Sequence, residues 1–180
     1  MRYTAIADVS RALTELIRGG IVPELITKSD FVGLCSPANS GDFQLGIYLY
    51  NVEESESYRL SGRQNSGLYK QKYPPIVLDL EYMITPYYKS DVKFLAEEEQ
   101  AVLGKIIQVI NDNNQIDFPN GEVVMLSLSN PSLDDRQKIW NGSTPYRTSI
   151  FVSAKAVVVE SAKEKTVSRV TDVTIQTDIK

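Results

Sequence analysis

The stretch from residue 43 to residue 111 constrains the fold most, because three long patterned segments follow one another there with little between them. In residues 43–52, Leu45, Ile47 and Leu49 alternate with tyrosines, and residues 76–85 alternate apolar and other side chains in the same way. A period of two is typical of a strand that has one face on a core and a wetter opposite face. The pattern therefore predicts two long strands over these residues.

The third segment, residues 97–111, changes to a helical period. Leu103, Ile106, Ile107 and Ile110 are spaced i, i+3, i+4 and i+7, which is the apolar stripe of an amphipathic helix. We expect this stripe to cover the core face of the strands, so that Ile107 meets Leu80 of the second strand.

Shorter patterns complete the chain. Residues 3–18 predict a helix that ends at Gly19-Gly20, where glycine supplies positive φ without steric cost. Further predicted elements are a short strand (31–35), a long loop or arm (58–73), a turn-rich connection (111–121), a strand (122–129), a short helix (132–140) and a long strand (146–160). Helices and strands follow a mixed rather than an alternating order, which favours the α+β class: one domain with a mixed or antiparallel sheet flanked by helices.

Length and composition are those of one globular domain. The chain has 180 residues, of which 42% are hydrophobic and 23% are charged. No apolar run approaches the roughly 20 residues of a membrane span, and the N-terminus lacks the basic-then-apolar pattern of a secretion signal. We expect a protein that is made and folded in the cytosol without a membrane partner, with a domain over residues 1–160 and a polar C-terminal arm over residues 161–180.

The chain contains no histidine and one cysteine. The missing histidine removes the Ser-His-Asp and Cys-His nucleophile systems and most zinc sites. Cys35 lies in an apolar run, which favours a small core residue over a reactive thiol. An enzyme of this composition would depend on carboxylates, lysine or tyrosine, so we expect no catalysis, no metal and no cofactor.

Asp79 and Glu81 form a carboxylate pair with a spacing that suits a metal site. Two residues apart on a strand, they could hold Mg²⁺ in a nuclease-like site. A nuclease of this kind would have a Glu-x-Lys pattern next, but Tyr82 and Met83 follow Glu81. We therefore expect both carboxylates on the wetter face of the strand, and the carboxylate-metal nuclease is the weaker of two alternative functions.

The other alternative rests on residues 58–73, where Arg59, Arg63, Lys70 and Lys72 are interleaved with tyrosines. Such a mixture is typical of single-stranded nucleic-acid binding by charge and stacking. Three glutamates at 53, 54 and 56 largely cancel the charge, and the whole chain has a net charge of −4. We favour a solvated loop, or one that is ordered against a protein partner, over a nucleic-acid-binding module.

Two further features are candidate protein interfaces. Trp140 ends the short predicted helix, where it would be an apolar plug at the edge of the core or an interface hot spot. In the polar tail, Val167, Val173 and Ile175 alternate with polar residues and suit a strand that is added to a neighbouring subunit's sheet edge. We expect this arm, residues 166–180, to be poorly ordered in isolation.

These segments, in this order, resemble the cap, or tail-terminator, proteins of phage-tail-like contractile injection systems. More narrowly, they resemble the N-terminal domain of the cap protein in extracellular particles of the virulence-cassette and antifeeding-prophage type. The resemblance covers roughly Ala5 to Val159. Its carriers are the helix IADVSRALTELI, the strands IYLYNVEES and PPIVLDLEYMITPYY, and the helical stretches LGKIIQVINDN and KIW.

The resemblance implies a bacterial structural protein rather than an enzyme. Six copies would form a ring that closes the distal end of the inner tube and sheath, ends their polymerisation and anchors the sheath. The partners would be other copies of the chain together with the sheath and tube proteins, and no nucleic acid is expected. The protein would be cytoplasmic during assembly and then part of the particle, which some systems release from the cell.

Overall fold

The structure, a computed structural model, describes residues 3–58, 62, 64–65, 70–88, 92–140 and 146–166. Its larger sheet has six strands in the order β1-β2-β5-β8-β7-β6, with β1 parallel to β2 and every other neighbouring pair antiparallel. The strands are β1 (Val32–Leu34), β2 (Leu45–Glu54), β5 (Ile76–Pro86), β6 (Gln115–Asp117), β7 (Val123–Ser129) and β8 (Ile150–Val159). The three-residue strand β6 lies in the stretch that the sequence predicts to be a turn.

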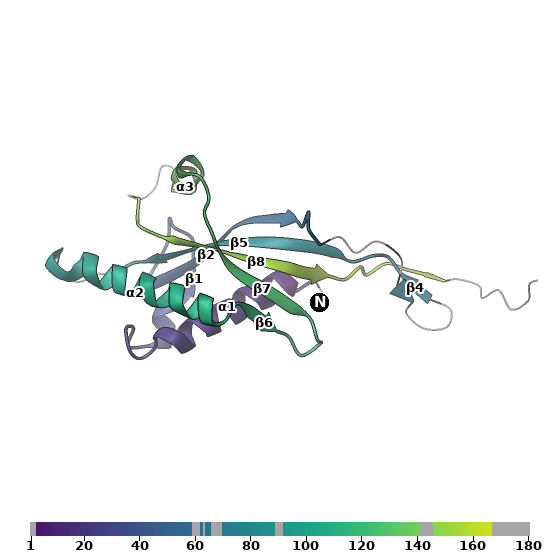
Figure 1. The fold of residues 1–180 in the computed structure, drawn as a ribbon, viewed down its shortest axis with the longest axis horizontal. Helices are drawn as coiled ribbons and strands as arrows, with labels where there is room; N and C mark the ends of the chain where they lie inside the picture. The colour runs from purple at the N-terminus through teal and green to yellow at the C-terminus, as the bar shows by residue number, and fades with distance from the viewer. Residues whose placement is uncertain are drawn as a thin grey trace, which may run out of the picture.

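Helices α1 (Ala5–Ile21) and α2 (Val92–Asp112) lie together on one side of the larger sheet, and the short helix α3 (Leu133–Ile139) lies on the other (Figure 1). A three-residue 3₁₀ helix (Ser29–Phe31) precedes β1. Ser132 caps α3, since its hydroxyl accepts a hydrogen bond from the Asp135 backbone N–H. The predicted α+β class, with a mixed sheet flanked by helices, is confirmed.

The main core lies between α1, α2 and the sheet. Leu13 and Ile17 of α1 and Leu80, Tyr82 and Ile84 of β5 are fully buried in it. Inside this apolar layer the Tyr82 hydroxyl and the Ser10 hydroxyl are 2.8 Å apart and form a buried hydrogen bond. The alternation seen in the sequence of β5 therefore does mark its core face.

Helix α1 does not end at Gly19-Gly20, so that prediction is wrong. The helix continues to Ile21, and Pro23 follows. Gly20 lies at the crossing of α1 and α2, where an added β-carbon would overlap the Val109 side chain. The second glycine thus permits a close helix–helix approach, whereas a β-carbon at Gly19 would have open space around it.

The predicted contact of Ile107 with Leu80 is also wrong. Leu80 is fully buried, but 39% of Ile107 is exposed. The buried stripe of α2 consists of Val102, Leu103, Ile106, Val109 and Ile110. Ile107 follows Ile106 by about 100° around the helix, which turns it out of that stripe, and Ile106 takes the core position.

The second face of the sheet carries a smaller core. Met83 of β5 packs there with Tyr87, Trp140 and Phe151, all buried. The alternation of the strand predicts a wetter face here, and the prediction fails at Met83 because covering residues from distant parts of the chain bury it.

A β-bulge between β5 and β8 changes the surroundings of Asp79. The register shifts between Leu78 and Leu80, and Ala156 of β8 has a φ of 65°. Asp79 is only 8% exposed: its Oδ1 accepts a hydrogen bond from the Ala156 N–H (3.4 Å) and its Oδ2 one from the Ser55 hydroxyl (3.2 Å). The prediction that Asp79 lies on a wet face is wrong, because Ala156 in the bulge and Ser55, just after β2, provide internal hydrogen-bond donors for its carboxylate.

A separate three-stranded antiparallel sheet consists of β3 (Gln64–Asn65), β4 (Lys70–Lys72) and β9 (Glu164–Thr166), in the order β3-β4-β9. It lies toward one end of the molecule's long axis, away from α1 and α2 (Figure 1). Part of the predicted 58–73 loop is therefore strand. Thr166, the first residue of the predicted arm, pairs with Lys70 of the same chain, and residues 167–180 lie outside the described residues.

Candidate assembly surfaces

The small sheet β3-β4-β9 brings two of the predicted interface residues together. Lys70 forms an ion pair with Glu164 (Nζ to Oε2, 3.0 Å), and Lys72 forms one with Glu160 (3.3 Å). The hydrogen bond from Lys72 lowers the pKa of the Glu160 carboxyl. Every side chain of β4 and β9 is polar, so these two strands bury no apolar core of their own.

The remaining predicted interface residues divide into two groups. Arg59, Arg63, Val167, Val173 and Ile175 lie outside the described residues, so their role stays a prediction. Trp140, at the C-terminal end of α3, is only 5% exposed and belongs to the smaller core, with its ring 6.2 Å from that of Tyr146. Its place in the fold matches the apolar plug considered above, and a further role at an interface stays a prediction.

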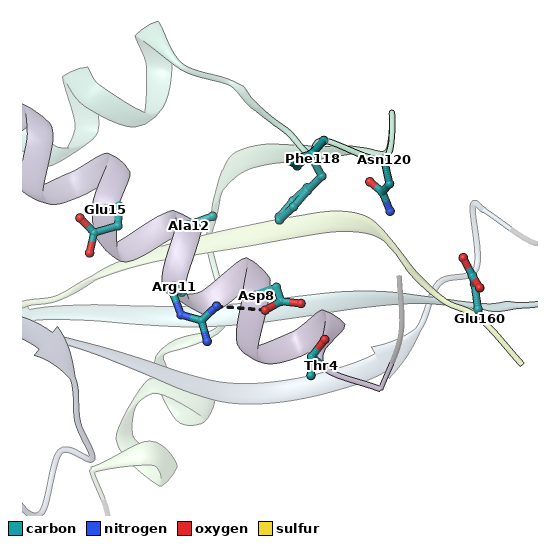
Figure 2. Close-up of a pocket in the computed structure, with 9 residues that line it drawn as sticks. Thr4, Asp8, Arg11, Ala12, Glu15, Phe118, Asn120 and Glu160 are labelled. Atoms are coloured by element: carbon teal, nitrogen blue, oxygen red, sulfur yellow. Dashed lines mark hydrogen bonds and ion pairs between the residues drawn. The ribbon is translucent and has the colours of Figure 1, made fainter. Parts of the chain in front are cut away.

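A cleft that the sequence does not predict lies beside α1 (Figure 2). Its volume is about 710 Å³, and three parts of the chain line it: the exposed side of α1, the turn between β6 and β7, and Glu160 just after β8. The lining residues are Thr4, Asp8, Arg11, Ala12, Glu15, Phe118, Pro119, Asn120 and Glu160. We refer to these nine residues as the α1 cleft.

The α1 cleft combines apolar and acidic lining. Ala12, Phe118 and Pro119 contribute apolar surface, while three carboxylates and one guanidinium contribute charge. Arg11 Nη1 forms an ion pair with the Asp8 carboxylate (3.1 Å; dashed line in Figure 2). Glu15 pairs with Arg18 outside the cleft at 2.6 Å. Only the alternation of polar and apolar residues along α1 hints at this surface in the sequence, because the other two walls come from residues more than 100 positions away.

The carboxylates considered for a metal site are engaged by the protein. Asp79 accepts the two hydrogen bonds described above, and Glu81 Oε2 accepts hydrogen bonds from the hydroxyls of Ser129 (2.9 Å) and Tyr50 (3.4 Å). Within the described ranges, no three side chains of the metal-binding types gather as a possible ion site. Both carboxylates act as acceptors that tie neighbouring strands together.

The fold is similar to that of two solved terminators of contractile injection systems. The solved structure described as the sheath/tube terminator of an extracellular contractile injection system, PVC, in its extended state, matches 97% of this chain and 64% of its own with a TM-score of 0.70 and 18% identity. The solved tube-terminating cap of the anti-feeding prophage matches 95% of this chain and 61% of its own, with a TM-score of 0.66 and 16% identity. At these identities the likeness establishes the fold.

The chain belongs to the Pvc16 N-terminal domain family, whose model matches residues 8–172. It spans less than two thirds of the length of either solved chain. No curated protein matches it by sequence. Among the described residues, no helix combines the length and the apolar character needed to cross a membrane.

Proposed function

We propose that this chain is a structural cap, or tail terminator, of a contractile injection system. In this role it closes the distal end of the inner tube and sheath and ends their polymerisation. The observation that carries the proposal is the match of nearly the whole chain, 97%, to a sheath/tube terminator, together with the family match over residues 8–172. The cap function therefore belongs to the domain described above.

The proposed role is structural rather than enzymatic. The chain has no histidine, and Asp79 and Glu81 are hydrogen-bonded to neighbouring strands. Both carboxylates therefore have a structural role as hydrogen-bond acceptors. No contact among the described residues favours the nucleic-acid-binding or nuclease alternatives.

The cap acts as a closed ring, which we take to have six copies, in contact with the sheath and inner-tube proteins. A ring with a single type of interface requires two different surfaces on each copy, one for the preceding and one for the following neighbour. In this proposal the arm over residues 166–180 adds a strand to an adjacent subunit or a sheath subunit.

The cap assembles in the bacterial cytoplasm and then becomes part of the particle. One of the similar structures is described as part of an extracellular contractile injection system, and release of the particle from the cell is part of this proposal.

The proposal is tested by assembling particles from tube, sheath and baseplate proteins with and without this chain. Electron microscopy then gives the distribution of sheath lengths. We expect a narrow distribution with the chain and a broad one, with ragged distal ends, without it. Equal distributions in the two preparations would contradict a terminator role.

A further inference from the structure

We propose that the open edge of β2 receives the C-terminal arm of a neighbouring copy as an added strand. The open edge is the outer side of residues 49–54, and the arm that it receives is residues 167–180, which follow β9. This inference rests on the proposed function, because it names the surface that receives the arm and commits to another copy of the chain over a sheath subunit.

The outer side of β2 is covered only over the first residues of the strand. β1 pairs with residues 45–47, and the Cys35 backbone N–H donates to the Ile47 carbonyl. Beyond that point no strand of the described chain pairs with β2 on this side, and Figure 1 shows the second half of β2 at the margin of the sheet. The last four residues of β2 are all exposed. The larger sheet therefore has a free edge here.

The register with β5 shows which backbone groups of this edge are free. The Ser55 N–H donates to the Val77 carbonyl. In an antiparallel pair, residues bonded in this way alternate with residues whose backbone groups point away from the partner strand. Counting back from Ser55, Val52 and Glu54 are residues of the second kind, and no described backbone group bonds to them on the outer side. An added strand gains these main-chain hydrogen bonds.

The other edges of the two sheets are short or already covered. At β1, the Arg18 guanidinium donates two hydrogen bonds to the Val32 carbonyl, at 3.1 and 2.6 Å. At the opposite edge, β6 has three residues, and the Asn114 carbonyl just before it accepts a hydrogen bond from the Leu126 N–H of β7. The outer strands of the small sheet, β3 and β9, have two and three residues. The edge of β2 is therefore the longest open edge in the described chain.

The sequence of the arm is that of a strand. Of its 14 residues, eight are Val, Ile or Thr, which favour strands, and none is Gly or Pro. Fully extended, 14 residues span about 46–50 Å, whereas a six-residue edge spans about 20 Å. More than half of that reach is left to bridge the distance between copies. Thr166, the residue before the arm, pairs with Lys70 toward one end of the long axis (Figure 1), so the arm starts at the periphery of the molecule.

Charge favours this pairing of edge and arm. Residues 49–56 contain three glutamates and no basic side chain, and neither Glu53 nor Glu54 forms an ion pair within the described part of the chain. Residues 163–171 contain three basic side chains and one glutamate, which already pairs with Lys70. Opposite charges on neighbouring strands stabilise their pairing, and like charges destabilise it. Two β2 edges paired with each other would bring their glutamates together and close as a pair, not as a ring.

The test is disulfide formation between full-length chains that each carry one cysteine, in a Cys35→Ser background. One chain carries Val52→Cys at the open edge together with an affinity tag that makes it larger, and the others carry single cysteines scanned over residues 167–175. The matched control replaces Val52→Cys by Leu34→Cys at the covered edge of β1, since Leu34 is 49% and Val52 is 42% exposed. A further chain with Glu53→Cys probes the opposite face of β2, because neighbouring residues of a strand alternate.

Assembled particles and concentrated purified chains are both oxidised mildly, and heterodimers are identified by size. We expect Val52→Cys to form disulfides with alternate positions over part of the arm, at yields several-fold above the Leu34→Cys control. Glu53→Cys should prefer the intervening positions, as a paired strand requires.

Yields equal to the control along the whole scan, in both preparations, would overturn the inference. An arm cysteine that carries benzophenone maleimide and attaches to the sheath protein but not to this chain would also overturn it, as would a chain with both cysteines that forms the disulfide only within itself. Capped particles without the disulfide would leave the proposed function standing and refute this contact alone. The disulfide in particles of uncontrolled sheath length would support the contact and contradict the proposed function.

Discussion

Leu80 and Ile107 provide a matched pair of core and surface positions. Leu80 is fully buried beside Tyr82 and Ile106, whereas 39% of Ile107 is exposed. We expect Leu80→Ala to lower the free energy of unfolding by about 2–5 kcal/mol, and Ile107→Ala by about 1.5 kcal/mol or less. Urea unfolding of the two variants measures both values. Equal losses would show that the register of α2 against the sheet is wrong.

The buried hydroxyl of Tyr82 should make the free energy of unfolding fall at alkaline pH. Burial raises the pKa of its hydroxyl from 10.0 to about 12, and the hydrogen bond with Ser10 lowers it in part. Below pH 10 the hydroxyl is neutral in both the folded and the unfolded chain. As the pH rises from 10 to about 12, the unfolded chain loses the proton first, so the free energy of unfolding falls across this window.

The measurement is urea unfolding at a series of pH values from 8 to 12, for the parent and for Tyr82→Phe. The variant should be less stable at pH 8, because it lacks the bond to Ser10, yet lose less stability toward pH 12. Tyr50 and Tyr87 also have pKa values raised to about 12, so part of the fall should remain. Parallel curves for the two proteins would contradict the burial of a neutral Tyr82 hydroxyl.

Among the elements, the crossing of α1 and α2 depends on one of two adjacent glycines. An added β-carbon at Gly20 overlaps Val109, whereas one at Gly19 meets nothing within 4 Å. We expect Gly20→Ala to destabilise the protein by about 1–3 kcal/mol through overpacking. Gly19→Ala should instead stabilise it by about 0.5–1 kcal/mol, since glycine inside a helix is unfavourable. Thermal melts of the two variants that shift in the same direction would contradict the close crossing.

The C-terminal arm is tested by truncation after Ala162. The larger sheet and both cores lie before this point, so circular dichroism should show a folded domain with only a small loss of strand. The truncation removes β9 and the predicted arm, and particles made with it should have sheaths of uncontrolled length. Normal sheath lengths with the truncated chain would show that the arm is dispensable for capping.

At this scale, the limits of sequence-based prediction have physical causes. The period-two segments of β2 and β5 and the helical stripe of α2 are visible because each is long enough to repeat its pattern. β3, β4 and β6 are two or three residues long and have no period. The bulge at Asp79 depends on an extra residue in β8, and no feature of the β5 sequence indicates it.

Some candidate surface residues can be predicted from the sequence, and others cannot. Lys70 and Lys72 can be selected from the sequence because their charge and their aromatic neighbours are local features. The α1 cleft could not be predicted, since it exists only where Asp8, Phe118 and Glu160 come together through the fold. The smaller core is hidden for the same reason, because Met83, Trp140 and Phe151 lie on three separate elements.

As a whole molecule, the chain is, in the proposed function, one subunit of a closed ring at the distal end of a contractile particle. In such a ring, each copy would contact two neighbours through two different surfaces, so that no ring edge remains open. The purified chain can be monomeric if ring closure needs the end of the tube as a template. The oligomeric state that tests the proposal is therefore the one at the end of the particle.

Electron microscopy of the distal ends of intact particles, with this chain present and with it omitted, is the most direct test of the cap assignment. We expect a ring of sixfold density at the end of the tube and sheath, into each subunit of which the fold of residues 3–166 can be placed, and no such ring when the chain is omitted. An end that lacks sixfold density for this chain, or a ring that persists without it, would contradict the central claim.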